Sequence, residues 1–129
     1  MTVRPFARPG LWLGAWAFGW LMCIALSLLT PIALGGPPDS DKIGHFIAYF
    51  ILSAWAASIF RTRRAQLAAA CALVLLGLAM EWAQANLTSN RQGDLRDALA
   101  NTLGVALGLA LAFTPAATLL ERIDRKLFR

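Results

Sequence analysis

Four long stretches of this chain carry no formally charged residue, and they constrain the fold more than any other feature. They cover residues 9–38, 43–60, 65–80 and 98–120. A helix that crosses a bilayer needs about 20 mostly apolar residues, within a range of about 17–25. The third stretch reaches that length by including Glu81 and continuing toward Ala85. The sequence therefore predicts an all-α, polytopic membrane protein, a bundle of four transmembrane helices. The expected helices cover about residues 10–33, 42–60, 65–86 and 95–117.

The composition agrees with this class of protein. The chain has 129 residues, of which 58% are hydrophobic and 15% are charged. This is too apolar for a small soluble domain, and the length predicts a single domain over residues 1–129. The first apolar stretch is much longer than the central region of a signal peptide, which has about 7–15 residues. We therefore expect it to be an uncleaved helix.

The basic residues are distributed unevenly between the two sides of a four-span topology. The net charge is +5, and nine of the twelve basic residues fall in the two tails and the second loop. These nine are Arg4, Arg8, Arg61, Arg63, Arg64, Arg122, Arg125, Lys126 and Arg129. Positive charge marks the cytoplasmic side, so both termini are predicted to be cytoplasmic. The excess charge is thus explained by topology and by contact with anionic membrane lipid, and we expect no nucleic-acid partner.

Polar residues recur at helical spacing in the last three expected helices. Asp41, His45 and Tyr49 are spaced i, i+4, i+8, and Glu81 and Gln84 are three residues apart. A third series, which advances by 3, 4, 3 and 4 residues, consists of Asp94, Asp97, Asn101, Gly104 and Gly108. Each series lies on one face of its helix, near the non-cytoplasmic end. A charge near the bilayer centre costs about 2.5–3.5 kcal/mol, so these faces are expected to meet in one polar site.

Each of these residues also has a purely structural explanation. Asp94 is a natural N-cap, and Lys42 could extend to the headgroups. Asn101 could join two helices by a hydrogen bond worth about 0.6 kcal/mol. Taken together, however, the polar residues of three helices gather at one depth, and this favours a functional site over a purely structural network. Gly104 and Gly108 are predicted to let helices approach closely.

The Trp residues of the first expected helix recur every four residues, at Trp12, Trp16 and Trp20. We interpret this stripe as lipid-facing or as packing against other helices. Cys23 and Cys71 lie at different depths, so no disulfide is expected between them.

The polar series together resemble the VanZ-like family of small bacterial membrane proteins. The resemblance covers about residues 41–108, just over half of the chain. Its motifs are Asp41-Lys42-x-x-His45-Phe46-x-x-Tyr49, Glu81-x-x-Gln84, and Arg91-x-x-Asp94-x-x-Asp97-x-x-x-Asn101-x-x-Gly104. It implies a multi-pass protein of the bacterial inner membrane, with a link to teicoplanin resistance and the cell envelope. It implies no defined biochemical activity.

Three functions are compatible with these residues. The first is an enzyme or carrier that acts on a polar headgroup, with His45, Glu81 and Asp97 as candidate catalytic groups. The second is a binding site for a cell-wall precursor or a glycopeptide, and the third is a structural interhelical clamp. The candidate ligand-binding residues are Asp41, Lys42, Tyr49, Gln84, Arg91, Asp94 and Asn101. Of the basic groups, Lys42, Arg91 and Arg96 could hold a phosphate or a carboxylate.

No cofactor is expected from the sequence. His45, Glu81, Asp94 and Asp97 are chemically competent metal ligands. The spacings typical of zinc sites, HExxH and CxxC, do not occur. A divalent metal therefore stays the less favoured alternative.

Overall fold

The computed structural model describes residues 2–28, 40–87 and 94–128, and these residues are almost entirely helical. The helices are α1 (Pro9–Leu28), α2 (Ser40–Ile59), α3 (Arg63–Leu87), α4 (Leu95–Ala110), η1 (Leu111–Phe113), η2 (Pro115–Thr118) and α5 (Leu119–Phe128). Four of them are long and apolar enough to cross a membrane, where α4 is counted together with η1. The prediction of an all-α chain with four such helices is confirmed.

The end of the fourth expected helix differs from the prediction. We expected it to continue to about residue 117, but α4 ends at Ala110 and is followed by the short helices η1 and η2. Between them Thr114 has an extended backbone, with φ −121° and ψ 163°. The residue before a proline is excluded from the helical region by the proline ring, so Pro115 ends the helix earlier than its own position. The predicted end of the first helix, at residue 33, lies outside the described residues.

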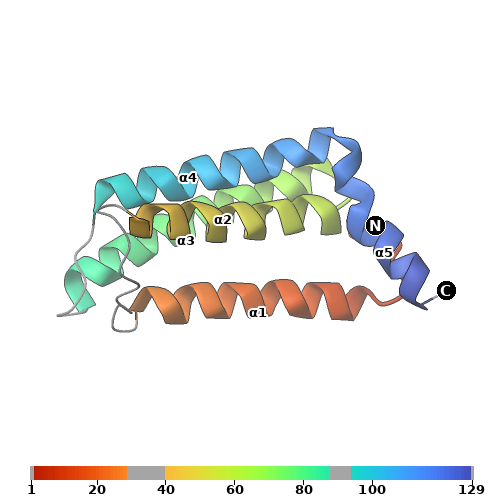
Figure 1. Ribbon diagram of the computed structural model, residues 1–129, viewed down its shortest axis with the longest axis horizontal. Coiled ribbons are helices and arrows are strands. Elements are labelled where there is room, and N and C mark those ends of the chain that lie inside the picture. The colour runs from red at the N-terminus through yellow and green to blue at the C-terminus, as the bar shows by residue number, and fades with distance from the viewer. Residues whose placement is uncertain (1, 29–39, 88–93, 129) are drawn as a thin grey trace.

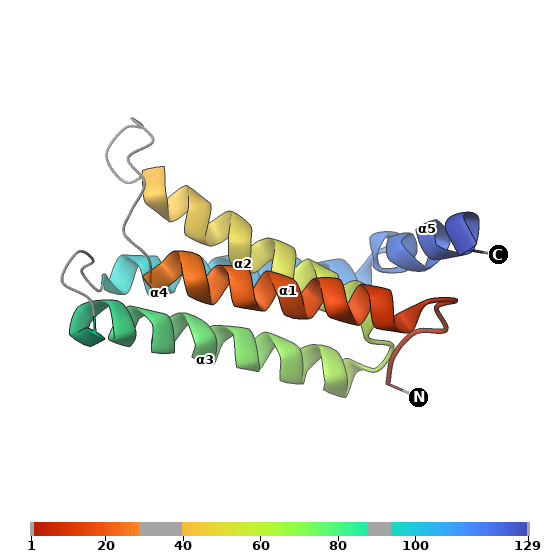
Figure 2. The ribbon, with the colours of Figure 1, turned by 90° about the horizontal axis from the view of Figure 1, so that it is seen from below.

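The four long helices pack as a bundle with both chain termini at one end (Figure 1). In this view α4 lies above α2 and α3, and α1 lies below them. Figure 2, which views the molecule from below, shows α1 in front of the other helices and running along the bundle. We call the end that holds the termini the terminal end, and the opposite end, where α1 and α3 finish and α2 and α4 begin, the distal end.

The closest approach in the bundle is between α2 and α4, and two glycines permit it. A Cβ atom on Gly104 would collide with the backbone carbonyl of Phe46, and one on Gly108 would lie 2.7 Å from the backbone of Ala54 and of Phe50. Any side chain at these positions would push the two backbones apart. The prediction that both glycines are packing positions is confirmed.

The Trp stripe of α1 packs against the other helices. The indole N–H of Trp16 donates to the carbonyl of Leu52, at 2.9 Å. Trp16 and Trp20 also cover the buried core cluster, which consists of Tyr49, Leu52, Ala70, Leu73 and Val105. Of the two interpretations of the stripe, the structure supports packing against other helices for these residues.

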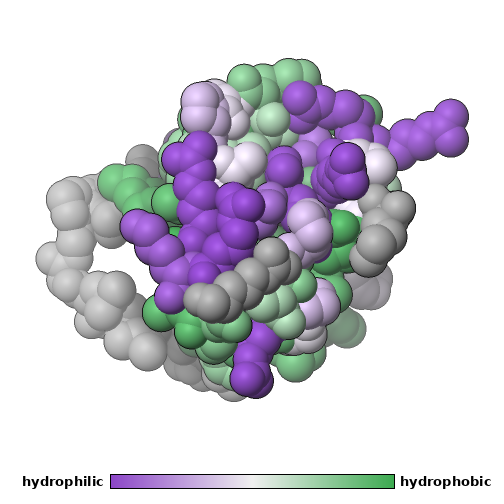
Figure 3. Space-filling model, turned by 90° about the vertical axis from the view of Figure 1, so that its right-hand side faces the viewer, coloured by the Kyte–Doolittle hydropathy of each residue, from purple (hydrophilic) through white to green (hydrophobic). Residues whose placement is uncertain are grey.

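The terminal end is hydrophilic. Figure 3 views the molecule from this side and shows a broad hydrophilic surface. The amphipathic helix α5 lies there, and so does the N-terminal segment, where Val3 forms an isolated bridge with Phe60. This end carries most of the basic residues that marked the predicted cytoplasmic side.

Candidate functional site

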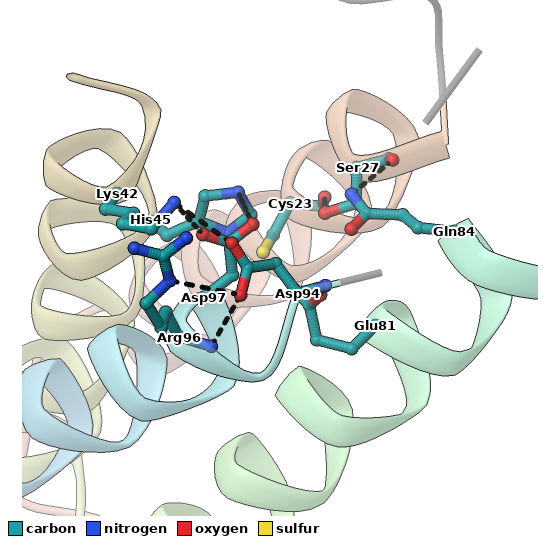
Figure 4. A network of polar contacts seen from close by, with 9 residues as sticks. All are labelled: Cys23, Ser27, Lys42, His45, Glu81, Gln84, Asp94, Arg96 and Asp97. Atoms are coloured by element: carbon teal, nitrogen blue, oxygen red, sulfur yellow. Dashed lines mark hydrogen bonds and ion pairs between the residues drawn. The ribbon is translucent and has the colours of Figure 1, made fainter. Parts of the chain in front are cut away.

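Most of the polar residues predicted to meet lie together at the distal end. Figure 4 shows polar side chains converging from the start of α2, the end of α3 and the start of α4, with α1 close by; among them are Lys42, His45, Glu81, Asp94 and Asp97. Helices α2 and α4 run in one direction and α3 runs in the other, so their polar faces reach the same level of the bundle. We define the polar cluster as Lys42, His45, Tyr49, Glu81, Asp94, Asp97 and Asn101.

Lys42 joins α2 to the first turn of α4. Its ammonium lies 3.3 Å from Asp94 Oδ2 and 3.2 Å from Asp97 Oδ1, so it bridges two carboxylates. His45 Nε2 lies 3.7 Å from Asp97 Oδ2, which is within ion-pair range but longer than a hydrogen bond. One turn of α2 therefore presents two basic side chains to the acidic first turn of α4.

Asp94 is the N-cap of α4, as predicted. Its backbone is extended and its carboxylate accepts a hydrogen bond from the backbone N–H of Arg96. That hydrogen bond, together with the Lys42 ammonium, holds the pKa of Asp94 below its ordinary value. The exposed guanidinium of Arg96 lies 3.7 Å from the same carboxylate. This carboxylate is therefore negatively charged at neutral pH.

Glu81 connects α3 to the same helix start. Its Oε2 accepts a hydrogen bond from the backbone N–H of Asp94, at 2.8 Å. The side chain is 9% exposed, and its Oε1 is buried without a hydrogen-bond partner among the described residues. His45 and Glu81 thus belong to one electrostatic network, linked through the start of α4.

A second polar layer lies deeper in the bundle. Tyr49 and Asn101 are almost fully buried, at 1% and 2% exposed. A Cβ atom on Gly77 would lie 3.2 Å from Asn101 Nδ2 and 3.5 Å from the ring of Tyr49, so this glycine makes room for both side chains. Within the described part of the chain, Asn101 Oδ1 has no hydrogen-bond partner. The Tyr49 hydroxyl lies beside the Cys23 thiol of α1, which is a weak partner.

Helix α1 also contributes polar groups to the distal end, which the sequence did not predict. The Gln84 side chain donates to the backbone carbonyl of Ser27, at 2.8 Å, so it turns toward α1 and away from the ion pairs. The Ser27 hydroxyl donates to the carbonyl of Cys23 one turn earlier. Only the spacing of Cys23 and Ser27, four residues apart in the outer half of the first apolar stretch, could have indicated this face.

Most of the predicted site residues are therefore brought together. Seven of them make up the polar cluster, with Tyr49 and Asn101 in its deeper layer. Gln84 lies at the α1 side of it. Asp41 belongs to α2, but its side chain is outside what the structure describes. Arg91 lies outside the described residues.

The arrangement does not form a metal-ligand set in the part of the chain that the structure covers. Among residues 2–28, 40–87 and 94–128, no three His, Cys, Asp or Glu side chains are grouped so that they could hold one ion. Both cysteines are free thiols, as expected from their different depths.

The comparisons with known proteins add one relative. No family model matches the chain, and no solved structure matches it. A fission yeast protein, described only as an uncharacterized protein of Schizosaccharomyces pombe, is 37% identical over 89 residues. The matched region covers 67% of this chain and 54% of the relative, so the chain spans about half of the length of the curated relative that it matches.

Proposed function

We propose that this protein is a VanZ-like integral membrane protein of the bacterial inner membrane whose polar cluster binds a cell-envelope ligand at the outer leaflet. Both termini are cytoplasmic in this proposal. The observation that carries it is the set of buried polar atoms without partners at the distal end. Glu81 Oε1 and Asn101 Oδ1 are buried, and no described residue satisfies them. A buried acceptor without a partner costs about 1–3 kcal/mol, and a bound ligand would recover that energy.

The chemistry of these atoms favours a ligand that donates hydrogen bonds. A carboxylate oxygen and an amide oxygen are acceptors only, and the Tyr49 hydroxyl can accept as well as donate. The Lys42 ammonium already lies between two carboxylates, which disfavours capture of a phosphate by this residue. Sugar hydroxyls and peptide N–H groups are suitable donors, and both occur in a glycopeptide and in a lipid-linked cell-wall precursor.

The distribution of charge supports the proposed orientation. Nine of the twelve basic residues belong to the tails and the second loop, which meet at the terminal end, and this matches the cytoplasmic side of the positive-inside rule. The distal end then faces the outer leaflet, where cell-wall precursors are used. Thiol labelling tests this orientation in a Cys23→Ala, Cys71→Ala background. Leu87→Cys should react with an impermeant maleimide from outside the cell, and Arg61→Cys should react only after lysis.

A structural clamp is the second candidate, and one observation favours it. Lys42, Asp94 and Asp97 tie α2 to α4, and Glu81 ties α3 to the same turn. Such contacts could serve only to hold three helices in register. A clamp should lose stability when a member is removed, whereas a binding site should lose ligand affinity first.

Binding of teicoplanin to the protein in phosphatidylcholine nanodiscs separates the two candidates. We expect Glu81→Gln and His45→Gln to weaken binding about tenfold or more while the melting temperature changes little. Asp97→Asn should weaken binding too, because it removes charge without changing shape. Glu121→Gln in α5 is the matched control at the terminal end and should bind as the wild type does. Early melting of the distal-end variants, with unchanged affinity of the folded fraction, would assign the cluster to the clamp.

The same geometry allows an enzyme, with His45 and Asp97 as an acid–base pair. The distance of 3.7 Å between them would have to shorten before a proton passes directly. Turnover of a lipid-linked precursor, lost in His45→Gln while binding persists, would identify such an activity.

A further inference from the structure

An apolar groove runs along the membrane-spanning part of the protein between α3 and α4. On α3 it extends from Leu67 to Leu75, and on α4 from Thr102 to Leu109. Its floor includes Ala70 and Val105, which are both buried. The volume is about 440 Å³, and the lining is apolar except for the side chain of Thr102.

The dimensions of the groove indicate what fits into it. The α3 wall covers eight residue steps, or about 12 Å of helix axis. The space of about 440 Å³ is open along one side, so it is a surface groove and not an enclosed channel. It is long enough to hold one extended hydrocarbon chain that lies along the two helices. An α-helix with its side chains is about 10–12 Å wide and could only pack over the open side of the groove.

The groove leads toward the polar cluster. Helices α3 and α4 are antiparallel, so Leu75 and Thr102 mark its distal end. Along α3, Val74, Leu78 and Glu81 follow at steps of four and three and lie on one face. Along α4, the same face continues from Thr102 through Ala98 to Asp94. Glu81 lies about 9 Å beyond Leu75 along the helix, and it contacts Asp94 at this seam.

We propose that this groove holds the hydrocarbon chain of a single-chain or polyprenyl-type lipid whose hydrogen-bond-donating headgroup lies in the polar cluster. The inference rests on the proposed function and specifies its ligand class. The hydrocarbon chain lies along α3 and α4 at membrane depth, and the headgroup reaches Glu81 at the distal end, with the buried Asn101 one layer deeper. A ligand of this kind uses both features, because an apolar chain alone has no reason to stop at the carboxylates.

Photolabelling with an alkyl glucoside that carries a diazirine in the middle of its chain tests this. With the protein in phosphatidylcholine nanodiscs, labels should map to residues 67–75 and 102–109, and excess unlabelled alkyl glucoside should abolish them. Ala106→Phe narrows the groove from α4 and should reduce labelling about tenfold, and Cys71→Phe should do so from α3. Ala72→Phe is the matched control, because Ala72 is exposed on α3 and does not line the groove.

The outcomes separate the groove from the headgroup site. Equal labelling by a diazirine alkane without a headgroup, with no competition by the glucoside, would mean that bulk lipid fills the groove and would overturn the inference. If glucoside binding depends on Glu81 but the labels map to other segments, the proposed headgroup site is supported and the groove is not the site of the hydrocarbon chain. If groove labelling survives Glu81→Gln and Asn101→Leu, the groove stands as a chain site and the proposed headgroup site is wrong. Disulfide crosslinking of two copies through Cys71, in a Cys23→Ala background, would assign the groove to a second copy.

Discussion

Both ends of the bundle bury acidic and amide side chains, but among the described residues only the distal end has such side chains with an acceptor oxygen left without a partner. At the terminal end Asp124 is 0% exposed and accepts hydrogen bonds from the backbone N–H groups of Ala7 and Arg8 and from the indole of Trp12. Gln66, 1% exposed, likewise has partners for its oxygen and its nitrogen. At the distal end, Glu81 and Asn101 keep buried acceptor oxygens without partners among the described residues.

This difference separates a structural polar group from a candidate binding group. Both kinds look alike in sequence, because each is a polar residue in or beside an apolar stretch. A satisfied buried group contributes to stability, and its removal leaves its partners unpaired. An unsatisfied one lowers stability unless something binds to it. We therefore expect substitutions at the terminal end to change mainly stability, and those at the distal end to change mainly binding.

The largest expected effect is that of Asp124→Ala. It would leave two backbone N–H groups and the Trp12 indole without their acceptor, and it would release α5 from the N-terminal segment. We expect the free energy of unfolding to fall by about 3 kcal/mol or more, which would appear as a lower melting temperature in detergent. Glucoside or teicoplanin binding by the folded fraction should not change. A melting temperature within a degree or two of the wild type would contradict the structural role of this end.

The next largest expected effect is that of Gln66→Leu. The Gln66 amide donates to the carbonyls of Ala57, at 3.2 Å, and Phe60, at 2.9 Å, and its oxygen accepts from Arg63. Leucine has a similar volume but leaves these groups unpaired around the turn between α2 and α3. We therefore expect the free energy of unfolding to fall by about 2 kcal/mol. Denaturation of the purified protein measures it. The matched comparison is Gln84→Leu at the distal end, which removes the hydrogen bond to the Ser27 carbonyl between α3 and α1.

Gly77→Ala should lower the free energy of unfolding by about 1 kcal/mol and also weaken ligand binding. The added methyl group would press on Asn101, with contacts of 3.2–3.3 Å, and the amide has little room to move. Gly10→Ala in α1 is the control, because a Cβ atom there meets no atom within 4 Å. If both glycine variants melted and bound alike, the close contact of Gly77 with Asn101 would not matter for the site.

Glu81→Gln should have a smaller effect on stability, below about 1 kcal/mol, because the amide oxygen can still accept from the N–H of Asp94. Its effect on ligand binding should be much larger than its effect on melting. Measurement of both quantities on the same sample gives the clearest contrast with Asp124→Ala. If the variant lost several degrees of melting temperature and no affinity, Glu81 would have a structural role like that of Asp124.

The smallest effect concerns pH. The pKa of Asp94 is lowered in the folded protein, so its carboxylate binds protons less readily there than in the unfolded chain. Its contribution to stability is therefore present above the ordinary aspartate pKa of about 3.9 and is lost as the pH falls through the lower folded value. We expect a modest drop in melting temperature below about pH 4, and a smaller one in Asp94→Asn. An identical pH profile for the two proteins would remove Asp94 as the source.

Much of the architecture is determined by the sequence itself. The length of the apolar stretches determines four helices that could cross a membrane, because the bilayer sets the length that a span needs. Helical periodicity determines that Lys42, His45 and Tyr49 lie along one side of α2, and the Gly104–Gly108 spacing determines a close helix contact. The N-cap role of Asp94 is equally local, since it depends only on the start of the following helix.

The remaining features were decided by tertiary structure. Periodicity defines a face of a helix, but it does not say which helix that face will meet. For this reason Gln84 was expected beside the ion pairs and instead contacts Ser27 of α1, and Asp124 gave no sign that it would bind the start of the chain. The apolar groove also exists only because α3 and α4 lie side by side with small side chains between them. Satisfied and unsatisfied polar groups differ only in their neighbours, and the packing of the helices determines which residues become neighbours.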